Sequence, residues 1–203
     1  MFMDTFQILF LFLLSSFYSI YLAKMIILKF QNIQGNILGK EDKPKKAHAI
    51  EVILKITTYL GAMVQFISVL FLKQSWFVSR IWQFREIGII LGVMGNLFFL
   101  LSVVTMKENW RAGFSSKQNT ELVTQGIYRI SRNPAFVGFD LLYIGCALTF
   151  PNIIHLVIAV LVVILFHIQI LGEEKYLLMV FKESYKQYQK CVKRYIGRKK
   201  FVE

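Results

Sequence analysis

The feature that most constrains this chain is a series of five apolar stretches, each close to the length that crosses a bilayer. They cover residues 5–28, 49–72, 86–106, 134–150 and 152–171. A helix needs about 20 apolar residues to cross about 30 Å of hydrocarbon. The first three stretches exceed this length, and the last two are shorter than the first three. The pattern predicts an all-α, polytopic membrane protein with about five transmembrane helices.

Composition supports this fold class. Hydrophobic residues make up 56% of the 203 residues, and the mean hydropathy is +0.52. Both values are typical of an integral membrane protein. The first stretch has no Lys or Arg before it, since residues 1–4 lack both. A signal peptide carries positive charge there, so we expect a retained membrane helix instead.

The last two stretches are separated only by Pro151. Proline disfavours a continuous helix, both at its own position and at the residue before it. We therefore predict a tight antiparallel hairpin of two helices. The alternative is one long helix with a kink at Pro151.

The formal net charge is +12. Because the basic residues flank apolar stretches, their expected partner is anionic membrane lipid and not nucleic acid. Most of them fall in the loop after residue 28, the loop before residue 134 and the tail after residue 171. The positive-inside rule then places the N-terminus outside and the C-terminus in the cytoplasm. It also places residues 107–133 and the tail on the same, cytoplasmic side.

The tail carries an apolar pattern of helical period. Its members recur every three or four residues: Leu177, Phe181, Tyr185, Tyr188, Val192 and Tyr195. This spacing predicts an amphipathic helix that continues from the fifth stretch. The apolar face could rest on lipid, pack on the cytoplasmic loops, or do both.

A polar segment turns into an apolar helix between residues 121 and 145. Asn133 is a favoured N-cap residue and Pro134 a favoured first helical residue, so a helix is expected to begin at Pro134. The unpaired N–H groups of its first turn would form a seat for an anion. Arg129 and Arg132 precede this turn.

Two carboxylates, Glu173 and Glu174, end the fifth stretch on the same side of the membrane. Charged groups at a membrane edge are costly and are often functional. One of them could hold a cation or a ribose hydroxyl, and the alternative is a pair of solvated interfacial acids. Gln169 lies one turn before Glu173 on the same helix face. The two cysteines, Cys146 and Cys191, have no ligand spacing, so no metal site is expected.

Other polar residues have open interpretations. Asp140 could line a polar pocket, pair with Arg132, or be a protonated structural group. His167 fits a hydrogen-bonded packing residue better than a functional one. Arg111 is expected to bind lipid headgroups, with Trp110 as an interfacial anchor.

Four motifs carry a resemblance to a known family. They are LVTQGIYR at 122–129, SRNPAFVG at 131–138, GEE at 172–174 and the spaced pattern Phe181, Tyr185, Lys186, Gln187, Tyr188. In this order they resemble the isoprenylcysteine carboxyl methyltransferase family. That family lies within a wider group of membrane methyltransferases that includes phospholipid N-methyltransferases.

The resemblance implies S-adenosylmethionine as cofactor, bound near the ends of the last two stretches and covered by the tail. It implies that the following residues bind the cofactor: Glu121, Leu122, Val123, Tyr128, Asn133, Pro134, Ala135, Phe136 and Glu173. The first three would line it with their backbone, and Glu173 would hold its ribose or amino group. The residues assigned to catalysis are Glu174, Arg132 and Gln169.

The sequence departs from the family pattern at two places. The family's RHPxY reads RNPAF at 132–136, so a titratable His is replaced by Asn133 and a Tyr hydroxyl is lost at Phe136. In the prenylcysteine enzymes an Arg that is expected to handle the substrate carboxylate stands where this chain has Gln169. Gln cannot make the charged bidentate contact.

We therefore predict one membrane domain over residues 1–203. Residues 1–106 hold three spans, and residues 107–203 hold the cofactor loop, the hairpin and the tail helix. The predicted function is methyl transfer to a lipophilic, membrane-embedded substrate. A carboxylate or thiolate acceptor needs no base, whereas an amine or hydroxyl would need Glu174 or Asp140. The alternatives are a phospholipid or small-molecule N/S-methyltransferase and a non-enzymatic transport or scaffold protein.

Overall fold

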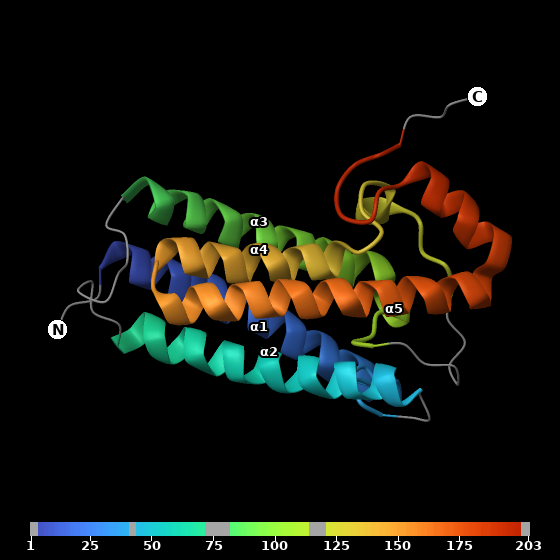
Figure 1. Cartoon of the computed structure of the whole chain (residues 1–203), viewed down its shortest axis with the longest axis horizontal. Helices are drawn as coiled ribbons and strands as arrows, with labels where there is room; N and C mark the ends of the chain where they lie inside the picture. Colours follow the sequence, from blue (N-terminus) through green and yellow to red (C-terminus); the bar gives the residue numbers. More distant parts are fainter. Residues whose placement is uncertain (1–3, 41–43, 72–81, 114–120, 200–203) are drawn as a thin grey trace.

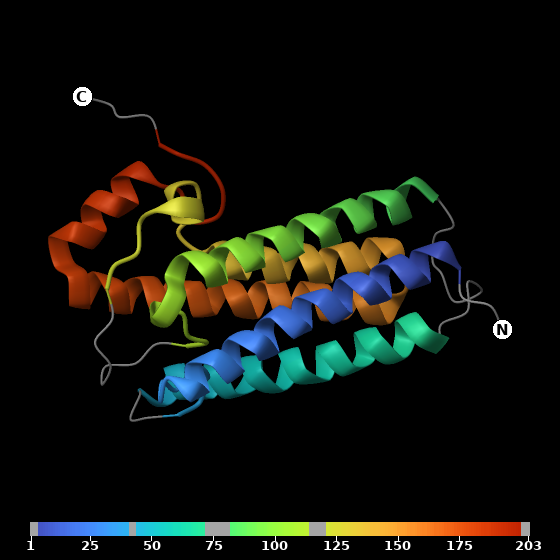
Figure 2. The same ribbon diagram turned by 180° about the vertical axis from the view of Figure 1, so that it is seen from behind.

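The computed structural model describes residues 4–40, 44–71, 82–113 and 121–199. Within these ranges the chain is helical, with isolated bridges and no strand. The α-helices are α1 (Thr5–Phe30), α2 (Lys45–Phe71), α3 (Trp82–Met106), α4 (Pro134–Thr149) and α5 (Ile153–Cys191). Two 3₁₀ turns follow α3: η2 (Lys107–Asn109) and η3 (Gly126–Arg129). Figures 1 and 2 show the five α-helices side by side in one bundle, which confirms the predicted all-α class.

The hydropathy pattern predicts the centres of the membrane helices better than their first residues. α1 and α4 begin where predicted, but α2 begins at Lys45 and α3 at Trp82, four residues before the apolar stretches. Their first turns hold polar residues that fit a helix but not the hydrocarbon. α1, α2, α3 and α5 are long and apolar enough to cross a membrane, and α4 is shorter with 16 residues. The chain is therefore a multi-pass membrane protein.

α3 and α4 pack with their backbones in close contact. A Cβ atom placed on Gly88 would lie 2.5 Å from the carbonyl oxygen of Gly145, and one on Gly95 would lie 2.7 Å from that of Gly138. No larger residue fits at these crossings without separating the helices. Small residues allow this approach in membrane bundles. The pair therefore forms a fixed block that carries the segment between α3 and α4.

The predicted hairpin at Pro151 is confirmed. α4 ends at Thr149 and α5 begins at Ile153, and the side chain of Asn152 accepts a hydrogen bond from the His155 N–H as its N-cap. The start of α3 is fixed at the same end of the bundle, because Arg85 donates a hydrogen bond to the Thr149 carbonyl at 3.0 Å. Arg85 also forms an ion pair with Asp4 at 2.7 Å.

α5 has 39 residues and would be about 58 Å long if straight, about twice the hydrocarbon thickness. Its apolar part ends near Leu171, so we treat the rest as outside the membrane. The backbone leaves helical geometry at Lys182, with φ 45° and ψ −117°. The last turns then fold back over the segment that follows α3, as Figures 1 and 2 show in red.

The apolar face of the tail packs on protein. Tyr185, Tyr188 and Val192 form a buried cluster with Tyr128 of η3, and Leu177 and Phe181 pack against it. The apolar face of the tail was predicted to rest on lipid, to pack on the cytoplasmic loops, or to do both. The contacts show that it packs on the loops. The prediction of one helical stripe through Tyr195 was wrong at its end, because the helix stops at Cys191. Residues 192–199 turn back instead, and the Gly197 N–H donates to the Ile130 carbonyl at 2.6 Å.

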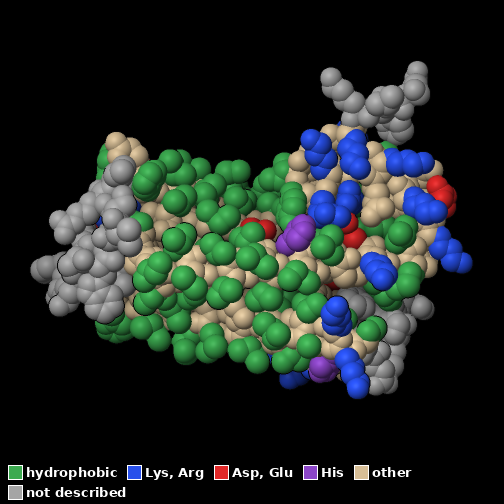
Figure 3. Space-filling view, viewed as in Figure 1, with side chains coloured by type: hydrophobic (Ala, Val, Ile, Leu, Met, Phe, Trp, Pro, Cys, Tyr) green, Lys and Arg blue, Asp and Glu red, His purple; other side chains and the backbone are tan. Residues whose placement is uncertain are grey.

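Surface chemistry divides the molecule into two parts. Figure 3 shows hydrophobic side chains over the helices and Lys and Arg gathered at one end. This basic end carries the loop between α1 and α2, the segment between α3 and α4, and the tail. The segment between α3 and α4 thus lies beside the tail, as the predicted cofactor site requires.

Candidate functional site

A pocket lies at the basic end, between the segment that joins α3 to α4 and the outer part of α5. Its empty volume, mouth included, is about 910 Å³. We call it the basic-end pocket. The predicted residues on its wall are Glu121, Leu122, Val123, Tyr128, Arg132, Asn133, Ala135, Phe136 and Glu173. Residues from two motifs about 40 positions apart thus face one space.

The wall formed by η3 is fixed by a sharp turn and by buried hydroxyls. Gly126 has φ +57°, a conformation that residues with a Cβ rarely adopt. The Tyr128 hydroxyl lies 2.7 Å from the Ser102 hydroxyl, and burial raises the pKa of Tyr128. The Tyr188 hydroxyl donates to the Tyr128 carbonyl at 2.6 Å. The tail is thereby bonded directly to this wall.

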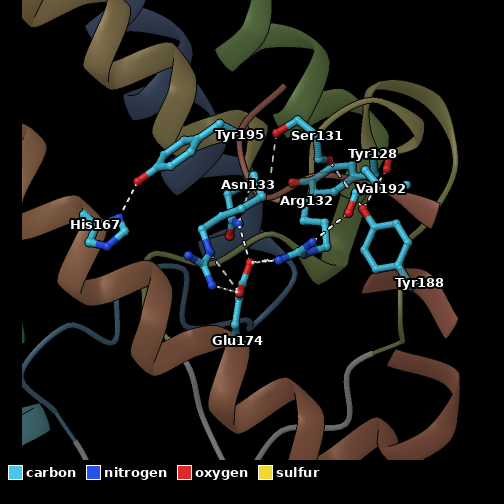
Figure 4. A network of polar contacts seen from close by, with 10 residues as sticks. Tyr128, Ser131, Arg132, Asn133, His167, Glu174, Tyr188, Val192 and Tyr195 are labelled. Carbon is cyan, nitrogen blue, oxygen red and sulfur yellow. Dashed lines mark hydrogen bonds and ion pairs between the residues drawn. The ribbon is translucent and has the colours of Figure 1, made fainter. Parts of the chain in front are cut away.

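Glu174 is the centre of a buried ion cluster, shown in Figure 4. Arg132 donates to Oε1 at 3.1 and 2.7 Å, and Arg194 donates to Oε2 at 3.1 and 3.0 Å. The Asn133 amide donates to Oε1 at 3.1 Å. Burial alone would raise the pKa of this carboxyl, but the hydrogen bonds from Arg194 and Arg132 outweigh it and hold the pKa below its ordinary value.

This cluster changes how three predicted residues are understood. Glu174 lies behind the pocket wall, with both carboxylate oxygens bonded. Arg132 also donates to the Val192 carbonyl at 2.6 Å, so it ties the loop to the tail. The helix begins at Pro134 as predicted, but the Asn133 side chain makes no capping bond, because its amide serves Glu174 and the Arg194 carbonyl.

Glu173 has different surroundings from its neighbour. It lines the pocket and accepts a hydrogen bond from the Gln169 amide at 3.0 Å. The same amide nitrogen lies 3.4 Å from Oε1 of Glu51, a fully buried residue of α2. Sequence reasoning missed Glu51. The available signal was a carboxylate within an otherwise apolar stretch.

Asp140 and His167 lie away from the residues that line this pocket. Arg132 pairs with Glu174, so the suggested pair with Asp140 is not formed. Oδ1 of Asp140 is buried and has no hydrogen-bond partner within the described parts of the chain. Nδ1 of His167 lies 2.5 Å from the Tyr195 hydroxyl, which ties the tail to α5 (Figure 4).

A second, apolar pocket of about 1030 Å³ adjoins the first. Its wall includes the α1 and α2 residues Tyr18, Tyr21, Leu54, Thr58, Tyr59 and Ala62. The two pockets share Trp110, Arg111, Gly113, Ala135 and Phe136. The expected role of Trp110 as an interfacial anchor was wrong, because this residue is only 4% exposed and packs on Phe99 and Tyr21. Sequence reasoning missed this pocket. The signal that could have indicated it was the presence of tyrosines within apolar stretches.

Comparison with known proteins identifies a family for the chain. The phospholipid methyltransferase family model matches residues 64–184, which is well over half of the chain. The chain belongs to this family. Protein-S-isoprenylcysteine O-methyltransferase A of Arabidopsis thaliana is 27% identical over 150 residues, 72% of each chain. The Schizosaccharomyces pombe protein-S-isoprenylcysteine O-methyltransferase is 31% identical over 119 residues, 57% of this chain and 50% of the relative.

These matches confirm the predicted resemblance to isoprenylcysteine carboxyl methyltransferases, and they identify the chain as a methyltransferase. The alternative of a non-enzymatic transport or scaffold protein was therefore wrong. The family match begins within α2, so α1 and the first part of α2 lie outside it. Those outside segments supply much of the apolar pocket wall.

Proposed function

We propose that this protein transfers a methyl group from S-adenosylmethionine, held in the basic-end pocket, to a lipophilic acceptor held in the apolar pocket. The observation that carries the proposal is the wall common to both pockets, formed by Trp110, Arg111, Gly113, Ala135 and Phe136. A donor and an acceptor bound on either side of it would meet inside one protein. Alignment of the two reacting groups is the main contribution that a methyltransferase site makes.

The residues of the basic-end pocket fit the proposed cofactor. Its volume lies in the range of small-molecule sites. Tyr128, Phe136 and Tyr185 offer aromatic surface to an adenine ring or to a cation. Glu173 offers a carboxylate to a ribose hydroxyl or an amino group. S-adenosylmethionine supplies a methyl group on a positively charged sulfur, and that charge is lost when the methyl group leaves.

The chain's own residues favour an acceptor that needs no general base. Glu174, the predicted base, accepts hydrogen bonds from Arg132, Arg194 and Asn133. The two arginines hold its pKa low and keep it ionised. We therefore assign Glu174 and Arg132 to positioning of the loop and the tail. An anionic oxygen or sulfur nucleophile reacts without proton removal, and a site sheltered from water favours the loss of opposite charges.

The apolar pocket supports a lipid-like acceptor. Leu22, Leu38, Phe139 and Phe166 line it, and its polar groups are mainly tyrosine hydroxyls. The relatives are named for S-isoprenylcysteine, an acceptor with a long apolar chain. By the positive-inside rule the basic end faces the cytoplasm, and the reaction would occur at that membrane surface (Figure 3).

The test is calorimetric titration of the purified full chain with S-adenosylmethionine, followed by transfer of labelled methyl groups into a total lipid extract. We expect saturable binding by the wild type and a labelled lipid product. Glu183→Ala is the matched control for Glu173→Ala, because the Glu183 side chain is 65% exposed on the same helix. A folded wild-type protein that gives no binding heat would overturn the proposal. A labelled phospholipid amine would move the acceptor to the N-methylation class.

A further inference from the structure

Four residues from three distant parts of the chain form a hydrogen-bonded series that ends at the wall of the basic-end pocket. The Gly39 N–H donates to Oε2 of Glu51 at 2.8 Å. The Gln169 amide donates to Oε1 of Glu51 at 3.4 Å and to Oε1 of Glu173 at 3.0 Å. The series thus joins the loop after α1, the helices α2 and α5, and the wall of the pocket.

The inner members of this series are almost completely buried. Glu51 is 0% exposed and Gln169 is 3% exposed, whereas Glu173 reaches the pocket. A buried carboxylate costs free energy unless hydrogen bonds satisfy it. Hydrophobic residues in this part of α2 would avoid that cost. The presence of Glu51 therefore points to a task for its charge.

We propose that Glu51 and Gln169 are positioning residues that orient the Glu173 carboxylate toward the cofactor in the basic-end pocket. The inference rests on the proposed function, because it assigns to Glu173 a ligand that only the methyl-transfer reaction requires. A primary amide has two N–H donors and one fixed plane. One donor serves Glu51 and the other serves Glu173, so α2 sets the plane of the amide and the amide sets the Glu173 rotamer.

The series also gives Gln169 a task that differs from acceptor binding. Its amide nitrogen is used by two carboxylates within the protein, and its side chain is nearly closed to solvent. Gln169 was assigned to catalysis from the sequence. Its contacts instead place it behind a pocket residue, where it acts through Glu173.

The first test measures the dissociation constant of S-adenosylmethionine by calorimetry. Glu51→Leu keeps the approximate volume but removes both acceptors, so Glu173 loses its alignment. We expect the dissociation constant to rise about tenfold, while the KM for the acceptor stays within about twofold. Gln169→Leu should give the same result. Gln65→Leu is the matched control on α2, since Gln65 is 1% exposed but lies outside both pockets; it should leave cofactor affinity unchanged.

The second test repeats Glu51→Leu in a Glu173→Ala background. If Glu51 acts through Glu173, the added change in the dissociation constant falls below about twofold. Equal changes in both backgrounds would overturn the inference, because they would show a general structural effect. Where Glu51→Leu does not fold, Glu51→Gln serves instead. It keeps one acceptor, and we expect about a threefold rise that vanishes in the same background.

The two proposals fail in different ways. Absence of cofactor binding in the folded wild type would overturn the proposed function and this inference together. Wild-type binding with equal effects in both backgrounds would overturn the inference alone.

Discussion

Glu173 and Glu174 are neighbours in sequence, yet they lie in two regions with different contacts. Glu174 sits in a cluster with two arginines and an asparagine that fasten the tail to the loop. Glu173 faces a pocket and is held from behind by the neutral amide of Gln169. Consecutive helical residues point about 100° apart, so one turn of α5 serves both regions. The charged contacts of Glu174 suit assembly of the tail on the loop, and the position of Glu173 on the pocket wall suits contact with a ligand.

The sharpest test of this comparison is Glu174→Ala. It leaves Arg132 and Arg194 beside each other without their carboxylate, and breaking a buried ion pair costs about 3 kcal/mol. We expect lower thermal stability and faster proteolysis in the tail, with loss of methyl transfer as a consequence. Unchanged unfolding temperature and unchanged proteolysis would show that the cluster does not hold the tail.

Glu173→Ala should have the reverse profile. The carboxylate belongs to the pocket wall, so its loss should raise the dissociation constant of S-adenosylmethionine about tenfold. Stability should change by less than about 1 kcal/mol. Thermal unfolding and calorimetry on the same sample separate the two glutamates. A large stability loss here would remove the distinction between them.

Ala62→Phe tests the apolar pocket apart from both glutamates. Ala62 lines that pocket, and a larger side chain reduces the space for an acceptor. We expect the KM for the acceptor to rise about tenfold, with cofactor affinity unchanged. Ile56→Phe is the control, because Ile56 is 53% exposed on the same helix. Equal effects of both variants would contradict an acceptor site between α1 and α2.

The smallest expected effect is on pH dependence. The pKa of Glu174 is lower in the folded state than in the unfolded chain, so its ionised form stabilises the fold. That contribution is complete above the unfolded pKa, near 4.5, and is lost as pH falls through the folded pKa. Glu174→Gln should flatten the acid limb of a stability profile measured by thermal unfolding. A profile identical to wild type would exclude Glu174 as its source.

Sequence reasoning found what depends on local pattern. The apolar stretches located the five α-helices of the described residues, the Pro151 break gave the hairpin, and the ordered motifs placed Tyr128 and Phe136 on one pocket wall. It could not separate Glu173 from Glu174, because their roles depend on which cations the tail brings near. Arg194 lies 20 positions beyond Glu174, after a reversal at Lys182 that no residue pattern announces.

Contacts across the bundle were equally hidden. Glu51 and Gln169 are 118 positions apart in the sequence, yet their side chains are in contact. The apolar pocket is formed by helices that have similar hydropathy. Packing between α1, α2 and the last two helices decides those neighbours, and a single sequence does not encode that packing in a readable period. For the same reason Trp110 was predicted at the lipid interface although it is buried in the core.

The glycine contacts between α3 and α4 have a consequence for how activity can change in this chain. The segment that bears η3 leaves one of these helices and returns to the other, so its two anchor points are spaced by the Gly95 and Gly138 crossing. A single methyl group added there would spread both anchors, although it touches neither donor nor acceptor. Variants that damage methyl transfer should therefore also arise deep within the bilayer, at residues without a functional group.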